Sequence, residues 1–447
     1  MKRVLPTPPN LGQLKNQAKD LLKQIRSGDA EAVARLLRDH PRRLDYAAAK
    51  LSDAQLVIAR EYGFASWPKL KRHVEDLENL ETRVARLRSE FASGDAETKL
   101  RLLKPAHDRR RFENYDPSAA SISDADARLV VANEEGYAFW SKYESYLHLD
   151  PDVKDVIRAV RCGDLEGLRK ILRVDPAAAN PQWAPDFPAP VQPPNDSIPL
   201  FCVSEGVWRG TNTQGNDYDL THALLEAGAD IEIHGDLVIT GAASFNAIGV
   251  MRALLNGGAR VDGVDGDGVP MAYAMHFGFR ELAELMAKRG AKLDLRFAAG
   301  LGRLDLVQSW FNDDGSLKEG AGALADPYGF ELKRKGKPPF QCERTRRNIL
   351  SQALYFACVH QRLEVADFLL AQGAEINAIV PGLDSRATVL HQMVYQNASE
   401  LAALRFLVER GADSGIPDLN YRATALEWAR HFRRDEAIAI LSGITLE

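Results

Sequence analysis

The sequence predicts an all-α protein, built as an α-solenoid of stacked antiparallel helix pairs with long loop insertions. Segments with the apolar spacing of short amphipathic helices follow one another along the chain, and a glycine-terminated helix ending recurs five times. The chain has 447 residues, more than one compact core usually contains. Because two short helices cannot bury their apolar faces alone, we expect copies of the pair to stack on one another.

The stretch 265–294 shows the repeating unit most clearly. It opens with a turn-forming DGDG sequence, and Pro270 suits the first turn of a helix that Gly278 then ends. A second helix follows, with apolar residues on one face and charged residues on the other. Gly290 lies where the helix needs a left-handed residue, a conformation that glycine adopts without a steric penalty.

The same ending and opening recur in phase. The endings are LLEAGAD (224–230), LLNGGAR (254–260), LMAKRGA (285–291), LLAQGAE (369–375) and LVERGAD (407–413). The openings are IPLF (198–201), VPMA (269–272), TVLH (388–391) and TALE (424–427). With these motifs the chain resembles ankyrin-repeat proteins. The resemblance implies stacked helix pairs, a concave binding face and, for the threonine and histidine of the opening motif, structural hydrogen bonds.

A duplicated helical region precedes these repeats. RSGDAEAVARLL (26–37) matches ASGDAETKLRLL (92–103), and DAQLVIAREYGFASW (53–67) matches DARLVVANEEGYAFW (126–140), with a seven-residue insertion around 107–116. This arrangement ahead of the repeats resembles bacterial ankyrin-repeat proteins. Trp67 and Trp140 hold equivalent positions in the two copies, as packing residues or as partner anchors, and we favour packing.

These patterns define the expected domains. Residues 1–10 form a flexible lead, 11–149 hold two ankyrin-like four-helix units (11–79 and 80–149), and 150–447 form the ankyrin-repeat domain. That domain has insertions at 180–199, 206–216 and 312–348 and a C-terminal capping repeat at 421–447.

Composition narrows the classes of function. Lys and Arg number 57 against 62 Asp and Glu, a net charge of −5, which argues against nucleic acid as the partner. No apolar run approaches the ~20 residues of a membrane helix, no apolar signal segment follows MKRVLPTPPN, and four scattered cysteines form no CxxC. We therefore expect a soluble, cytoplasmic monomer that binds protein partners and no membrane.

The sequence contains no motif that carries chemistry. None of the ten histidines forms HxxxH or HExxH, and GGARVDGVDGDG (257–268) lacks the glutamate that closes a calcium loop. No glycine-rich stretch continues into the GKS or GKT of a phosphate loop. We expect no catalytic residue, no cofactor and no metal site.

The leading hypothesis is a non-enzymatic scaffold that binds a protein partner on the concave face of the solenoid. Aromatic residues and arginine carry a large share of interface energy, so we select these residue types from the turns and first helices. The predicted partner-binding residues are Trp208, Arg209, Tyr273, His276, Tyr355, Arg386, Tyr395 and Arg422.

Two alternatives stay open. An enzyme could use carboxylates from the insertions, namely Asp186, Asp196, Asp313, Asp314 and Glu319. The basic insertion could dock an acidic partner or nucleic acid, or pack against the chain's own acidic surface; its residues are Lys333, Arg334, Lys335, Lys337, Arg344, Arg346 and Arg347. A toxin-neutralising or effector-like role would also be a form of binding.

Overall fold

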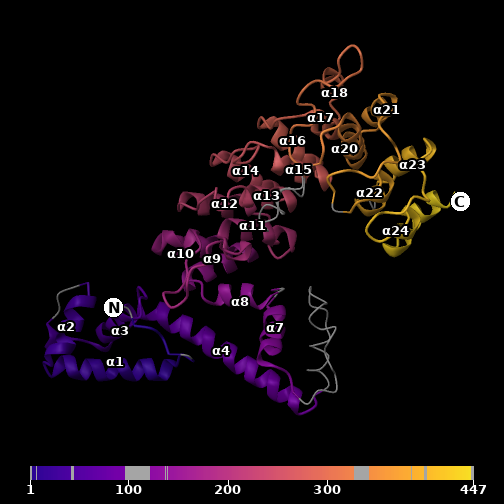
Figure 1. Ribbon diagram of the computed structural model, residues 1–447. Helices are drawn as coiled ribbons and strands as arrows, with labels where there is room; N and C mark the ends of the chain where they lie inside the picture. The colour runs from indigo at the N-terminus through magenta and orange to yellow at the C-terminus, as the bar shows by residue number, and fades with distance from the viewer. Residues whose placement is uncertain are drawn as a thin grey trace. The chain divides into compact units, whose positions relative to one another are not determined.

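The described part of the protein is built mainly from helices. The computed structural model (Figure 1) describes residues 3–6, 8–41, 45–95, 121–135, 137, 139–326, 342–383, 385–396 and 400–443. Within them, the regular elements are helices, accompanied by isolated β-bridges. This confirms the predicted all-α class. Among the described helices, none has the length and apolarity to cross a bilayer.

The chain divides into two compact units. Unit 1 contains Met1–Cys202 and Glu226–Ala229, and unit 2 contains Val203–Leu225 and Asp230–Glu447. The helices of unit 1 are α1 (Leu11–Arg26), α2 (Ala30–Asp39), α3 (Leu51–Glu61), α4 (Trp67–Ala92), α7 (Asp124–Glu134), α8 (Trp140–Leu147), α9 (Pro151–Cys162) and α10 (Leu165–Val174), with 3-10 turns at Tyr46–Ala48, Pro176–Ala179 and Asn195–Ser197. Helix α11 (Pro199–Trp208) spans the boundary, and α12 (Asp217–Glu226) follows it.

Unit 2 continues as a series of helix pairs. They are α13 (Leu237–Ser244) with α14 (Ile248–Asn256), α15 (Val269–His276) with α16 (Arg280–Lys288), α17 (Leu295–Leu301) with α18 (Leu304–Ser309), α20 (Arg346–Val359) with α21 (Leu363–Ala371), α22 (Val389–Gln396) with α23 (Ala402–Glu409), and α24 (Ala425–His431) with α25 (Asp435–Leu441). Within each pair the helices contact one another, and each first helix contacts the first helix of the next pair. This is the arrangement of an α-solenoid, as the sequence predicts.

The turn inside the pairs has one recurring backbone conformation. A residue with positive φ ends the first helix, and the next residue, which starts the second helix, has ψ near 67–80°. The six two-residue turns are 163–164, 246–247, 278–279, 302–303, 361–362 and 433–434. Two helices joined so tightly and lying against each other run antiparallel. Gly278 therefore ends a helix, as predicted, because φ there is 71°.

The predicted glycine endings also have the expected conformation. All five repeat glycines adopt positive φ, between 85° and 98°: Gly228, Gly258, Gly290, Gly373 and Gly411. A side chain at these positions would clash with its own backbone, so the recurring glycine has a local structural cause.

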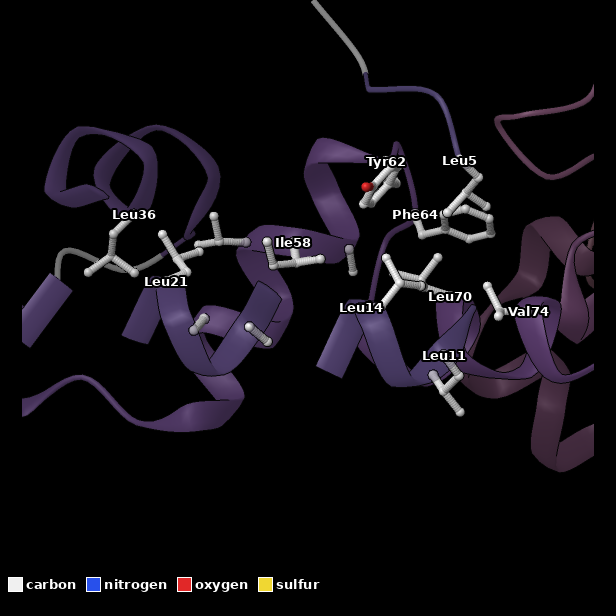
Figure 2. Close-up of a cluster of buried hydrophobic side chains, with 14 of the residues drawn as sticks. Leu5, Leu11, Leu14, Leu21, Leu36, Ile58, Tyr62, Phe64, Leu70 and Val74 are labelled. Atoms are coloured by element: carbon white, nitrogen blue, oxygen red, sulfur yellow. The ribbon is translucent and has the colours of Figure 1, made fainter. Parts of the chain in front are cut away.

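Helix α4 links two hydrophobic cores of unit 1. Its first half supplies Leu70 and Val74 to a core with Leu14 and Ile58, shown in Figure 2. Its second half supplies Leu80, and further apolar residues up to Phe91, to a second core with residues of α7 and α8. The border expected between residues 79 and 80 therefore falls inside a continuous helix, because no glycine or proline interrupts its sequence there.

The first residues are anchored rather than free. The Leu5 side chain is buried in the first core beside Phe64 (Figure 2), and the Arg3 amide donates a 2.8 Å hydrogen bond to the Glu61 carbonyl. The Arg3 guanidinium also lies 3.1 Å from the Glu61 carboxylate. Within the expected flexible lead, Arg3 and Leu5 thus contact the first core, a packing that composition alone does not reveal.

Two smaller expectations concern the duplicated region. Trp67 packs against the first core and Trp140 against the second, which confirms packing as the role of both rings. The insertion at 107–116 and most of the 92–103 match lie outside the described residues.

Candidate binding site

A pocket opens between the last helix pairs of unit 2. Its volume is about 540 Å³. The lining residues are His276, Ser385, Gln392, Tyr395, Asn420, Tyr421, Ala423, Glu427, Trp428, His431 and Phe432. Most come from α22, from α24 and from the turn before α24, so the pocket is built by two consecutive first helices and one projecting turn.

Aromatic rings at different orientations form the wall of the pocket. Tyr395 lies 5.4 Å from Phe432 and 6.5 Å from Trp428 between ring centroids, and the Tyr395 and Trp428 rings are inclined by 79°. The Tyr395 side chain is 50% exposed and that of Tyr421 is 77% exposed. Large rings left open to solvent around a concavity offer an apolar surface that a partner could cover.

Asp418 holds this wall in place. Its buried carboxylate accepts the indole N–H of Trp428 at 3.0 Å and the backbone N–H groups of Asn420, Tyr421 and Ala423 at 2.6–3.1 Å. Burial alone would raise the pKa of Asp418, but these hydrogen bonds outweigh it and place the pKa below its ordinary value. The charged carboxylate thus fixes both the Trp428 ring and the turn that carries Tyr421.

Two polar side chains near the rings, those of Glu427 and His391, form hydrogen bonds at the N-terminal ends of helices. Glu427 accepts the Thr424 amide at 2.7 Å and the Thr424 hydroxyl at 2.9 Å, forming the capping box of α24. These bonds lower the pKa of Glu427. His391 lies 2.8 Å from the Thr388 hydroxyl through Nδ1 and 3.0 Å from the Ala423 carbonyl through Nε2, which confirms its structural role in the opening motif.

Four of the eight predicted residues lie at this pocket or next to it in the chain. Tyr395 and His276 line it. Arg386 and Arg422 are exposed and adjoin the lining residues Ser385 and Tyr421.

Tyr355 and Tyr273 do not present surfaces to a partner. Tyr355 is fully buried on α20, where its hydroxyl lies 2.8 Å from His276 Nδ1 and 3.2 Å from the His276 carbonyl, and Tyr273 is 6% exposed on α15. Neither side chain is exposed, because first helices at the middle of a stack are covered on both sides; their part in partner binding stays a prediction. His276 is itself 3% exposed, and burial lowers its pKa to about 4.

Trp208 and Arg209 form a separate surface group. Trp208 is 60% exposed and stacks on Phe245 at 5.1 Å between centroids, with the Arg209 guanidinium 5.5 Å from the indole ring. Arg209 also lies 2.9 Å from the Glu205 carboxylate. Neither residue lines the pocket described above.

Sequence reasoning missed the pocket's central residues, Trp428, Phe432 and Tyr421. The available signal was the aromatic content of the last unit, where YRATALEWARHF places three rings in twelve residues. The prediction of a capping repeat at 421–447 gives these aromatic residues no role, and from this unit it selects only Arg422 for partner binding.

The carboxylates of the enzymatic alternative do not meet at this pocket. None of Asp186, Asp196, Asp313, Asp314 and Glu319 lines it. Asp313, Asp314 and Glu319 are exposed, and Asp314 accepts the amide and the hydroxyl of Ser316 in a turn. Asp186 lies 3.1 Å from His73 in unit 1.

The described arginines of the basic insertion pair with the chain itself. Arg344 donates to Asp326 at 3.0 Å and to the Leu324 carbonyl at 2.8 Å, and Arg347 pairs with Glu375. Arg346 donates to the Gln372 carbonyl at 2.7 Å. This favours packing against the chain's own polar groups; Lys333, Arg334, Lys335 and Lys337 lie outside the described residues.

Comparisons with known proteins give structural similarities only. No protein-family model and no curated protein matches the chain. Among solved structures the chain is similar to the human ASB11 ankyrin repeat domain, with 18% identity and a TM-score of 0.31 over 65% of this chain and 99% of that chain. It is also similar to the ankyrin repeat domain of Bcl-3, a member of the IkappaB protein family, with 19% identity and a TM-score of 0.27 over 64% of this chain and 97% of that chain.

Proposed function

We propose that this chain is a non-enzymatic ankyrin-type scaffold that binds a protein partner through the pocket of its last two helix pairs. The observation that carries the proposal is the group of exposed rings, Tyr395 and Tyr421, around a concavity backed by Trp428 and Phe432. The occupant we propose is an apolar side chain of the partner. Four of the lining residues are Tyr, Trp or Phe, and the Glu427 carboxylate is already engaged by Thr424.

Rigidity supports a binding role. Asp418 fixes the Trp428 ring and the turn of Tyr421 before any partner arrives, so little conformational entropy is lost when the pocket is filled. Aromatic residues held in this way are frequent hot spots of protein interfaces. We place the site on the concave face of the solenoid.

The proposed setting is the cytoplasm, with the scaffold acting as a monomer. All four cysteines are free thiols, and Cys202, Cys342 and Cys358 are buried. Persistent free thiols are typical of a reducing compartment.

The test is a crosslinking and affinity experiment on the full chain. A photo-crosslinking amino acid at position 395 should capture a partner in the native host, and the same group at Trp208 serves as the surface control. With that partner purified, Tyr395→Ala combined with Tyr421→Ala should weaken binding by about 30-fold or more, the effect of a hot-spot loss of ~2 kcal/mol. Trp208→Ala should leave the affinity unchanged.

The outcome can also contradict the proposal. If the double variant melts at the wild-type temperature yet binds the captured partner with wild-type affinity, the pocket is not the binding site. Loss of binding in Trp208→Ala alone would move the site to the group formed by Trp208, Arg209 and Phe245.

A further inference from the structure

Two histidines and an aspartate meet inside unit 1. His73 lies on α4, and His148 directly follows α8. Asp186 lies in the insertion at 180–199, the proline-rich insertion. One nitrogen or oxygen from each lies within 4.8 Å of the others, and His73 Nε2 is 3.1 Å from Asp186 Oδ2. The three residues are far apart in sequence, so no motif of fixed spacing predicts the cluster.

The protein holds these three side chains in fixed positions. Leu149 and Trp183 form an antiparallel bridge, the Ala184 amide donates to the His148 carbonyl at 2.7 Å, and the insertion is thereby held against the end of α8. Phe187 stacks on the His148 ring at 4.3 Å with 11° between the planes. Phe64 lies 5.3 Å from the His73 ring, so apolar rings flank both imidazoles.

Hydrogen bonding does not account for this cluster. His73 is fully buried, yet its Nδ1 has no hydrogen-bond partner among the described residues, and the same is true of His148 Nδ1 and Asp186 Oδ1. Leaving a buried polar atom unpaired costs about 1–3 kcal/mol, so three in one place point to a group that completes the cluster. The single hydrogen bond between His73 and Asp186 does not involve the His148 ring.

A neighbouring acidic cluster shows the contrasting case. Asp150, Asp152 and Asp175 also place three carboxylate oxygens close together, but the Lys69 ammonium lies among them at 2.8–3.0 Å. That cluster already contains its cation. The Lys154 ammonium, on α9, pairs with Asp76 and the Leu147 carbonyl rather than with this cluster.

We propose that His73, His148 and Asp186 bind a divalent transition-metal ion of the zinc class. Two imidazoles and one carboxylate form a ligand set that zinc uses, with water in the remaining position. The bound ion would join α4, the end of α8 and the proline-rich insertion.

The experiment measures zinc affinity on the untagged full chain after chelator stripping. Zn²⁺ titration against a chromophoric chelator should show one site per chain, and Co²⁺ should give the visible absorption of a nitrogen- and oxygen-ligated ion. His148→Phe keeps the stacking on Phe187 but removes the nitrogen. Asp186→Asn keeps an oxygen that can accept from His73 but removes the charge.

Each of these variants should bind Zn²⁺ at least about 10- to 100-fold more weakly. His222→Ala, which removes an exposed histidine, is the matched control and should bind as the wild type does. The proposal is overturned if the wild type binds less than one equivalent of Zn²⁺, or if His148→Phe and Asp186→Asn, folded by circular dichroism, retain wild-type affinity. Because the cluster lies in unit 1 and the pocket in unit 2, the result is independent of the proposed partner binding.

Discussion

Arg296 is a fully buried cation in unit 2. Its guanidinium lies 2.7 Å from Asp294 and 3.0 Å from Asp326, and it also donates to Gln352 at 2.7 Å. Asp294 and Asp326 are buried, so water cannot solvate their charges once the guanidinium is removed. Arg296→Ala should therefore lower the free energy of unfolding of unit 2 by about 3–5 kcal/mol.

Urea unfolding followed by circular dichroism measures that loss. Arg252→Ala, an exposed arginine on α14, is the control and should change stability by less than about 0.5 kcal/mol. Equal effects of the two substitutions would show that the buried charge network contributes nothing specific.

Because His360 is buried, we expect the free energy of unfolding to fall in acid. Burial lowers its pKa to about 4, and the nearby positive charges of Arg280 and Arg362 act in the same direction, against the raising effect of the Met275 carbonyl. An unfolded histidine titrates near 6.5, so between about pH 6.5 and 4 the unfolded state binds more protons than the folded state. Stability therefore falls as pH is lowered through this window, by up to about 2 kcal/mol for one such residue at pH 5.

The variant His360→Gln tests this assignment. Glutamine can still donate to the Met275 carbonyl, 3.0 Å from Nε2 in the wild type, but it does not titrate. The difference between unfolding free energies at pH 7 and pH 5 should shrink by up to about 2 kcal/mol in this variant. His222→Gln should retain the wild-type difference; a wild-type difference in His360→Gln as well would refute the role of His360.

The sequence rule that favours aromatic residues on first helices selects Tyr395, which is half-exposed at the pocket; its part in binding stays a prediction. Tyr355 satisfied the same rule but is covered, because exposure depends on the neighbouring pairs and not on helix position. The histidine cluster could not be predicted from the sequence, because His73 and Asp186 are 113 positions apart and come together only when the chain folds.

At the scale of elements, α4 connects the two hydrophobic cores of the duplicated region. It runs from Trp67 to Ala92 through both cores of unit 1. Asn79→Pro places proline in the interior of this helix, where it removes a hydrogen bond and clashes with the preceding turn, and should cost about 3 kcal/mol or more.

Asn79→Ala is the matched control. Asn79 is exposed, and alanine has the higher helix propensity, so this variant should be as stable as the wild type or slightly more stable. Thermal unfolding of both variants compares them directly. If Asn79→Pro melted like the wild type, the helix would not be continuous at residue 79, and the two copies would be separate modules.

The sequence predicts helix endings at the repeat glycines, where the local residue specifies the backbone conformation. The repeat glycines adopt positive φ wherever the pattern placed them, and Gly278 ends α15. The sequence analysis places a border between residues 79 and 80 because the similarity of the two copies defines where each copy begins. That similarity does not show where a helix ends, and α4 continues through the border. The anchoring of Leu5 likewise depends on a core assembled from α1, α3 and α4.

At the scale of the whole molecule, the chain divides into two compact units, and we expect these units to unfold in separate transitions. In a solenoid, each pair is stabilised by its neighbours, and damage spreads chiefly within the stack that contains it. Arg296→Ala lies in unit 2 and Asn79→Pro in unit 1. Hydrogen exchange read by mass spectrometry at increasing urea should show early exposure of α13–α25 in the first variant and of α1–α8 in the second. Early exposure of all helices together in either variant would instead show a single cooperative unit.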